Sequence, residues 1–281
     1  MREFNEQDLK RLYRPESRSS KEDNGQVTII GGSSLFHGAP ILALKTASRV
    51  VDMVFFSSPE PSVGEVAAQI KSQLSSFIWF PWEQTQEYIK KSDVILIGPG
   101  FMRFRKESQE EECKNNKLCD VAGVETKRAT EELLKKFPGK QWVIDGGSLQ
   151  VMSPEFIPQN AILTPNKKEY QMLFGETEAT EMAKKYHCII VAKNAEALVY
   201  SPDDSVIVRG GNAGLTKGGT GDVLAGLTVA LAAKNPPFLA ACAASFVAKK
   251  AADELYQKVG FSYSADDLAE KIPEVLGGYF R

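Results

Sequence analysis

The segment GNAGLTKGGTGDVLAGLTVALAA, residues 211–233, joins a glycine-rich turn to the start of an apolar helix. Its glycines at positions 218, 219, 221 and 226 surround one acid, Asp222. A turn that starts a helix exposes several backbone N–H groups, and the helix dipole adds about half a positive charge there. Glycine lets phosphate oxygens come close to the backbone, because it has no Cβ. We therefore predict an anion-binding turn at residues 218–221.

Asp222 has two interpretations. A carboxylate in the first turn of a helix stabilises it as a cap, by about 1 kcal/mol. Alternatively, Asp222 is a general base next to a phosphoryl group in transfer, and the anion-binding turn favours this role, because phosphoryl transfer needs charge stabilisation and an oriented hydroxyl together. The segment is not a Walker P-loop, since Lys217 precedes its glycines. No GxGxxG follows the first predicted strand either.

Short strands alternate with helices along most of the chain. Apolar runs that end in glycine or polar residues predict strands within residues 27–32, 53–56, 93–100, 142–147, 161–166, 188–194, 197–201 and 206–211. Helical spacing predicts helices at residues 40–51, 82–91, 124–137, 166–174, 176–186, 219–233, 237–259 and 264–276. We expect a polar surface loop at residues 113–119. The pattern predicts an α/β fold with a mostly parallel sheet and helices on both faces, in one domain over residues 1–281.

Five predicted strands end in glycine or polar residues, at positions 31–33, 98–100, 145–147, 164–166 and 193–194. A single end of this kind is often only a turn. In a parallel sheet, however, all five ends lie at one edge, and ligands of open α/β sheets bind beyond the carboxyl ends of the strands. Together they predict a long ligand groove.

Composition limits the classes of protein that fit. The chain has 281 residues with 43% hydrophobic and 25% charged residues, as soluble globular proteins do. The net charge of −2 argues against nucleic-acid binding. Neither a signal peptide nor a membrane-spanning run is visible. The four cysteines form no CxxC pair and the chain has only two histidines, which predicts no zinc site and free thiols in a cytoplasmic protein.

Several motifs carry a resemblance to a known family. GGTGDVLAG resembles the phosphate-binding stretch of the ribokinase superfamily. IIGGSSLFHGAPILALKTASRV resembles the opening of the ADP- or ATP-dependent NAD(P)H-hydrate dehydratases. The segments ILIGPG, VIDGGSL, LTPNKKEYQMLFG, VAKNAEALVY and SADDLAEKIPEVL follow in that family's order and spacing. The resemblance runs from about residue 24 to residue 281, so residues 1–24 form an N-terminal extension.

The resemblance implies a ribokinase-like fold and the repair of NADH and NADPH whose nicotinamide ring has been hydrated. Members of the family use ATP or ADP, with Mg²⁺, to activate the ring hydroxyl for elimination. Asp222 would be the base, and the transferring phosphoryl group would be held by Gly219, Thr220 and Gly221. The hydrate would lie against Ala39, Gly100, Asp145, Asn166 and Asp222. The nucleotide would lie against Lys193, Asn194, Ala195, Glu196, Ala197 and Gly221. A solvated strand-end lysine is the alternative interpretation of Lys193. The sequence does not identify the metal ligands.

Three departures from the family pattern bear on the site. Asn166 stands where the family has histidine, and it can donate a hydrogen bond without carrying charge. The sequence GPGFMR replaces GPGLG, followed by Arg103 and Arg105, which either bind a pyrophosphate or are solvated. The segment KNAEA, residues 193–197, replaces KGxxT, which puts nucleotide affinity and choice in doubt.

Two alternative functions remain at this stage. LTPN also occurs in small-molecule kinases of the superfamily, which act on sugar, thiazole or pyrimidine alcohols. The changed KNAEA and GPGFMR segments are also compatible with a nucleotide-binding protein without catalysis, although such a protein has no need of Asp222. The resemblance further implies a homo-oligomer, either a dimer or a tetramer. It leaves the epimerase of the hydrates to a separate protein, because only about 24 residues precede the match.

Overall fold

A sheet of ten strands forms the centre of the computed structural model, which describes residues 1–104 and 121–280. The strand order is β1-β10-β9-β8-β7-β6-β5-β2-β3-β4. Neighbouring strands are parallel except that β9 runs antiparallel to both β8 and β10. The predicted mostly parallel sheet is confirmed. The strands are β1 (Arg2–Glu3), β2 (Gln26–Ile30), β3 (Met53–Ser57), β4 (Ile78–Trp79), β5 (Val94–Ile97), β6 (Gln141–Ile144), β7 (Ile162–Leu163), β8 (Ile189–Ala192), β9 (Ala197–Tyr200) and β10 (Ser205–Val208).

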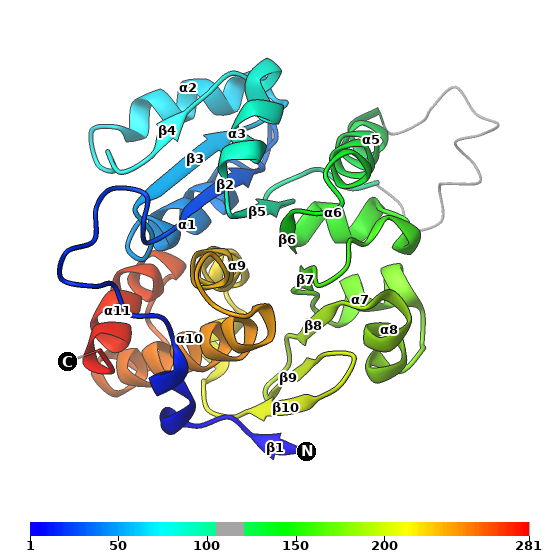
Figure 1. The fold of residues 1–281 in the computed structure, drawn as a ribbon. Helices are drawn as coiled ribbons and strands as arrows, with labels where there is room; N and C mark the ends of the chain where they lie inside the picture. Colours follow the sequence, from blue (N-terminus) through cyan, green and yellow to red (C-terminus); the bar gives the residue numbers. More distant parts are fainter. Residues whose placement is uncertain (105–120, 281) are drawn as a thin grey trace.

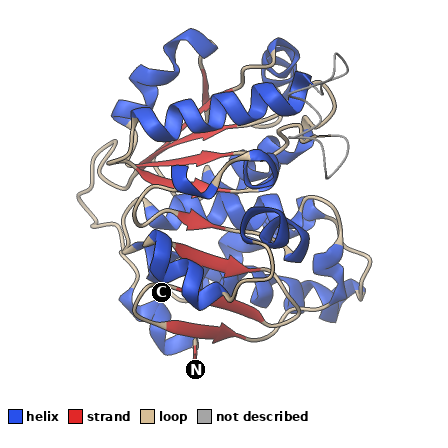
Figure 2. Cartoon of the chain, turned by 90° about the vertical axis from the view of Figure 1, so that its right-hand side faces the viewer, coloured by secondary structure: helices blue, strands red, loops and turns tan. Residues whose placement is uncertain are grey.

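Helices cover both faces of this sheet, as expected (Figures 1 and 2). One face carries α1 (Gly38–Ala47), α9 (Thr220–Ala232), α10 (Pro237–Val259) and α11 (Ala265–Gly278), with α9 packed between α1 and α10. The other face carries α3 (Thr85–Lys91), α5 (Val121–Lys136), α6 (Gly146–Val151), α7 (Lys167–Phe174) and α8 (Ala179–Tyr186). The remaining elements are α2 (Pro61–Ile70) and the short helices η1 (Glu6–Arg11), η2 (Trp82–Gln84), η3 (Pro154–Phe156) and η4 (Ala213–Thr216).

Alternation along the central strands divides the core in two. In β5, Val94 and Leu96 belong to the cluster under α1, α9 and α10, whereas Ile95 and Ile97 belong to the cluster under α5 to α8. All four side chains are at most 1% exposed. Since successive side chains of a strand point to opposite faces, a strand covered on both sides must be apolar throughout. This is why VILI is a strand and why its ends, rather than its faces, carry polar groups.

Most elements that the sequence did not predict are short or begin at glycine, but the sequence analysis also missed α2, a helix of ten residues. β1 and β4 have two residues each, too few to show a period. α6 begins at Gly146, directly after Asp145, where two glycines suggested only a loop. Ahead of the matched region, β1 pairs with β10, and Phe4, Leu9 and Leu12 are buried in the core. The expected surface loop at residues 113–119 lies outside the described residues.

In the described part of the chain, no helix combines the length and the apolar character that a membrane span requires.

The contact between α9 and α1 depends on Gly226. A Cβ at this position would lie 2.4 Å from the carbonyl oxygen of Ala43 and 2.6 Å from its Cα. Because the obstacle is the backbone of α1, it cannot rotate away as a side chain can. The glycine thus sets how closely α9 approaches α1.

We predict that Gly226→Ala destabilises the protein by about 1–3 kcal/mol, because the two helices must separate. In an open helix the same change would stabilise by up to about 1 kcal/mol. Urea unfolding of the variant, compared with Gly277→Ala in α11, measures the difference, since no atom lies within 4 Å of a Cβ at position 277. Equal stabilities of the two variants would contradict this packing.

Candidate active site

The five polar strand ends lie side by side, as the sequence predicts. They follow β8, β7, β6, β5 and β2, which are consecutive and parallel in the sheet. Asn166, after β7, forms a parallel bridge with Lys193, after β8. The first turn of α9 lies near the same edge, because a Cβ at Gly221 would lie 3.3 Å from the Lys193 Nζ. The edge therefore unites the groups that the sequence singled out from distant parts of the chain.

A buried ion-pair cluster lies at the centre of this edge. The Nζ of Lys193 lies 2.8 Å from Oδ1 of Asp145 and 4.0 Å from Oε2 of Glu169. The Thr164 hydroxyl donates a 2.7 Å hydrogen bond to the same Asp145 oxygen. The side chains of Asp145, Glu169 and Lys193 are 3%, 8% and 20% exposed. Lys193 is therefore an ion-paired residue, and the interpretation as a solvated strand-end cation is wrong.

Glu169 is a member of this cluster that the sequence analysis missed. It is residue N3 of α7, where its carboxylate accepts a 2.8 Å hydrogen bond from the N–H of Asn166, while the Asn166 Oδ1 accepts one from the N–H of Glu169. Gln150 donates a further hydrogen bond to Glu169, and Arg103 donates one to Gln150. The Asn-x-x-Glu spacing of a capping box was the available signal. A cap of this kind fixes the Glu169 carboxylate beside Lys193.

The charges of this cluster shift the pKa of Asp222. Burial, together with repulsion from Asp145 and Glu169, raises the pKa of Asp222 to about 7 against the attraction of Lys193. Burial also raises the pKa of Glu169, against the attraction of Lys193. Burial acts to lower the pKa of Lys193, but Asp145 and Glu169 outweigh it and raise that pKa, so Lys193 keeps its charge. A carboxyl whose pKa is near 7 is suited to take up a proton at neutral pH.

The glycines around Asp222 divide into two kinds. Gly219 has φ +93°, and a Cβ there would lie 2.4 Å from Leu42, so the fold itself requires glycine, as it does at position 226. A Cβ at Gly218 would meet no atom within 4 Å, and one at Gly221 would meet only the Lys193 Nζ, at 3.3 Å. Nothing in the described chain crowds Gly218, and at Gly221 only the end of the Lys193 side chain is close. An approaching ligand would explain their bare backbone.

Thr220 holds the turn in shape through its side chain. Its hydroxyl oxygen lies 2.7 Å from the carbonyl oxygen of Leu215 and 2.9 Å from that of Lys217, so the two carbonyls share its one proton. The Lys217 Nζ in turn donates to the carbonyl of Tyr263. Since the Thr220 hydroxyl is occupied, the backbone of the first turn is what faces an anion. The first N–H groups of a helix have no acceptor within it, and those of Gly221 and Asp222 belong to this turn.

The loop at residues 193–197 is anchored from α10. The buried Lys249 donates hydrogen bonds from Nζ to the carbonyls of Ala195, at 2.6 Å, and Gly210, at 2.8 Å. One turn later, Asp253 accepts a hydrogen bond from the N–H of Gly211. One helix thus holds both the loop after β8 and the segment after β10, which leads to α9.

The remaining residues of that loop differ in exposure. Asn194, Ala195 and Glu196 are exposed, and Oε1 of Glu196 lies 3.6 Å from Nε of Arg209. Ala197 is the first residue of β9, and its side chain is 4% exposed in the core. Only residues 194–196 and the backbone at 197 are therefore available to a ligand at this edge.

The predicted hydrate-binding residues Ala39 and Gly100 are neighbours. A Cβ at Gly100 would lie 3.2 Å from the Cβ of Ala39 and 2.5 Å from the carbonyl oxygen of Phe36. Gly100 follows β5, and Ala39 is in the first turn of α1. They lie on the β2 side of Asp145, whereas the 193–197 loop lies on the β8 side. The two predicted groups of binding residues therefore lie on opposite sides of Asp145 along this edge. Arg105 lies outside the described residues.

Within the described residues, no three His, Cys, Asp or Glu side chains are grouped so that they could hold a metal ion.

The fold and this site define a class. A ribokinase-like superfamily protein of Enterococcus faecalis has a TM-score of 0.78 over 99% of this chain and 96% of its own, at 22% identity. The ADP/ATP-dependent NAD(P)H-hydrate dehydratase of Bacillus subtilis, co-crystallised with ATP/Mg²⁺, has a TM-score of 0.73 over 99% and 98%, at 22% identity. The fold is therefore ribokinase-like.

The sequence places the chain within a family of that class. Residues 27–274 match the carbohydrate-kinase-like family model described as NAD(P)H-hydrate dehydratase. The chain belongs to the NAD(P)H-hydrate dehydratase family.

Curated relatives agree with this assignment. The bifunctional NAD(P)H-hydrate repair enzyme Nnr of Methanocaldococcus jannaschii is 38% identical, over 96% of this chain and 51% of its own length. The chain thus spans about half the length of the bifunctional relatives that it matches. The ADP-dependent enzyme of Nitrosopumilus maritimus is 27% identical over 92% of this chain and 91% of its own. The ATP-dependent enzyme of Drosophila melanogaster is 29% identical over 93% and 88%.

We predict that Lys249→Met weakens nucleotide binding about tenfold and changes kcat at saturating nucleotide less than about twofold, as the loss of one charge-assisted hydrogen bond of the loop implies. Calorimetric titration with ATP and ADP measures the dissociation constants, and steady-state kinetics measure kcat. Lys250→Met is the matched control, since Lys250 lies on the same helix and pairs with the surface residue Glu6, at 3.6 Å. A Lys249 variant that binds nucleotide as the wild type does would contradict the role of this anchor.

Proposed function

We propose that this protein dehydrates hydrated NADH or NADPH at the expense of a nucleoside phosphate. The observation that carries the proposal is the place of Asp222, a half-buried carboxyl in the first turn of α9, after a glycine turn that is open at Gly218. Burial and the neighbouring acids raise its pKa to about 7. The family to which the chain belongs supports the choice of substrate. It also favours dehydration over the simple phosphorylation of a sugar, thiazole or pyrimidine alcohol.

The reaction uses the two halves of the site in turn. Asp222 takes the proton from the hydroxyl of the hydrated ring as that oxygen attacks the terminal phosphorus of the nucleotide. The bond from this phosphorus to its bridging oxygen breaks, so that ATP leaves as ADP, or ADP as AMP. The backbone N–H groups at residues 219–221 hold the phosphoryl oxygens during transfer. The C–O bond then breaks, inorganic phosphate leaves, and loss of a proton from the adjacent ring carbon restores the dihydronicotinamide. Phosphate is a far better leaving group than hydroxide, which explains the use of a nucleotide.

Substrate and nucleotide would approach Asp222 from opposite sides. The hydrate would lie against Ala39 and Gly100, with Asn166 offering its side-chain amide N–H, because the Asn166 Oδ1 is used in the cap of α7. Asp145 would contribute through Lys193, to which it is tied at 2.8 Å. The nucleotide would lie against the loop of residues 193–197 and Gly221. ATP and ADP both occur in the names of the relatives, so the choice between them is open to experiment.

The residues fit Mg²⁺ that arrives with the nucleotide. Mg²⁺ commonly binds through one or two carboxylates together with substrate phosphates, rather than in a cage made only of protein groups. Glu169, beside Lys193, is the carboxylate that would hold it, so that Asp222 stays free as the base. When bound, Mg²⁺ would neutralise charge on the phosphates.

Other expectations from the sequence stay proposals. Two of the cysteines, Cys188 and Cys242, are free and buried, which supports a reducing, cytoplasmic location. Assembly as a dimer or tetramer rests on the resemblance alone. Epimerisation of the hydrates would be the task of a different unit, because the match covers only the dehydratase model.

The direct test is recovery of dihydronicotinamide absorbance from the S-hydrate of NADH or NADPH with ATP or ADP and Mg²⁺. Stoichiometric release of inorganic phosphate is expected in parallel. Absence of recovery with either nucleotide would reject the proposed function, and a stable phosphorylated product would indicate a kinase instead.

Asp222→Asn should lower kcat at least about 10²-fold, because the amide cannot accept the hydroxyl proton. Nucleotide affinity should change little, since the backbone that holds the phosphates is retained. Steady-state kinetics and nucleotide titration separate these effects, with the surface variant Asp266→Asn as the control. Retained turnover would remove Asp222 from the chemistry.

The pH dependence of kcat/KM should change when the charge of Lys193 is removed. A base must be deprotonated, so kcat/KM should fall about tenfold per pH unit below the Asp222 pKa of about 7. Because Lys193 acts to lower that pKa, Lys193→Met should move the acidic limb to higher pH, while Lys193→Arg should leave it near the wild-type position. Identical acidic limbs in all three proteins would exclude this coupling.

A further inference from the structure

A cavity of about 340 Å³ lies at the carboxyl ends of β2 and β3, beside α5. Its lining comes from the segment after β2, the segment after β3, η2, the residues after Gly100, and one side of α5. None of the residues assigned above to catalysis, hydrate or nucleotide lines it. Two of its members, Phe101 and Met102, directly follow Gly100, the predicted wall of the hydrate pocket. The cavity thus begins next to the predicted hydrate-binding residue Gly100.

The position of the cavity along the sheet matches one end of a long ligand. The ion-pair cluster is centred on β7, and β2 and β3 lie three and four strands away in the sheet order. At about 4.8 Å per strand, the separation is roughly 14–19 Å. Ala39 and Gly100 lie between the two places. A hydrated dinucleotide consists of two nucleosides joined by a pyrophosphate, so it must cover several strands when its ring lies at Asp222.

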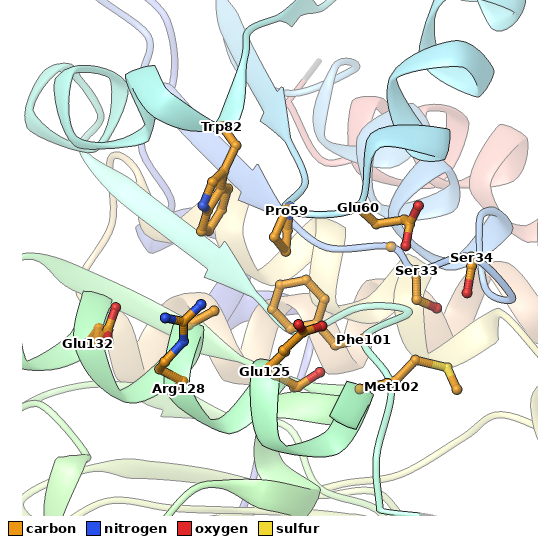
Figure 3. A pocket seen from close by; sticks show the side chains of 14 residues that line it. Ser33, Ser34, Pro59, Glu60, Trp82, Phe101, Met102, Glu125, Arg128 and Glu132 are labelled. Atoms are coloured by element: carbon orange, nitrogen blue, oxygen red, sulfur yellow. The ribbon is translucent and has the colours of Figure 1, made fainter. Parts of the chain in front are cut away.

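The lining of the cavity is suited to a flat heteroaromatic ring. Figure 3 shows the Trp82 indole pointing into the cavity from one side and the Arg128 guanidinium rising towards it from α5, with the Phe101 ring nearby. Phe101 is 5% exposed and belongs to the core, so it is a rigid floor. The Arg128 residue is exposed on α5, so its guanidinium is accessible to a ligand. Planar bases stack on tryptophan faces and on arginine planes.

The charges around the cavity favour a ligand that offers hydrogen-bond donors. Glu60, Glu125 and Glu132 line it together with one cation, Arg128. Glu60 is already used in capping α2, through the N–H and the hydroxyl of Ser62. Glu125 and Glu132 are exposed and lie one turn before and one turn after Arg128 on α5. Carboxylates accept hydrogen bonds from ribose hydroxyls, as in dinucleotide-binding folds, and they repel a second phosphate group.

We propose that this cavity binds the adenosine half of the hydrated dinucleotide, with the adenine ring between Trp82 and Arg128. The ribose faces the carboxylates of α5, which favours the free 2′-hydroxyl of NADH-hydrate over the 2′-phosphate of NADPH-hydrate. This inference rests on the proposed function, since it concerns the same substrate.

The test compares NADH-hydrate with the hydrate of reduced nicotinamide mononucleotide, which lacks the adenosine half. Trp82→Ala and Arg128→Ala should each lower kcat/KM for NADH-hydrate by about 5- to 150-fold, the effect expected for a lost stacking contact. Neither should change kcat/KM for the mononucleotide hydrate. Lys135→Ala, on α5 outside the cavity, is the matched control and should change neither value.

The outcomes separate this proposal from the function itself. Equal losses with both hydrates, or no loss with NADH-hydrate, would overturn the assignment of the cavity while leaving the dehydratase intact. Turnover of neither hydrate by the wild type would reject the proposed function. Glu132→Lys should shift the ratio of kcat/KM values towards NADPH-hydrate by about tenfold, and an unchanged ratio would contradict the ribose assignment.

Discussion

The site depends on one half-buried cation, Lys193, placed among three carboxyl groups. The Lys193 Nζ lies 2.8 Å from Oδ1 of Asp145 and 4.0 Å from Oε2 of Glu169. Its charge also acts to lower the pKa of Asp222. Without this charge, the acids would repel one another in a region largely removed from water, and their carboxyls would tend to take up protons instead. Removing one partner of such a buried pair typically costs about 3–5 kcal/mol. The lysine thus both permits the cluster and limits how far the pKa of Asp222 can rise.

The architecture explains how these groups meet. Parallel strands end at one edge, so residues that follow β6, β7 and β8 become neighbours although they are far apart in the chain. Helix α9 packs close to α1 because Gly226 allows the approach, and this places its first turn at the same edge. In the proposed function, substrate, base and nucleotide would follow one another along this edge, from the cavity at β2 and β3 to the loop after β8.

Much of this arrangement could be predicted from the sequence, because strong local patterns carry it. The apolar strands, the glycine turn with Asp222, and the polar strand ends each have a signal within a few residues. The ion-pair cluster could not be predicted in the same way, since the partnership of Lys193 with Asp145 joins residues 48 positions apart. Glu169 showed its capping spacing but not its approach to Lys193. Trp82 belongs to a short helix whose contacts depend entirely on the tertiary fold.

The most direct test of the account is the titration of the Asp222 carboxyl by ¹³C NMR. The signal is assigned by its absence in Asp222→Asn. The account predicts that this carboxyl titrates near pH 7 in the wild-type protein without ligands, because burial and the neighbouring acids raise its pKa against the pull of Lys193. Titration near pH ~4, the range of an ordinary aspartate, would contradict the central claim that the cluster prepares Asp222 as a base.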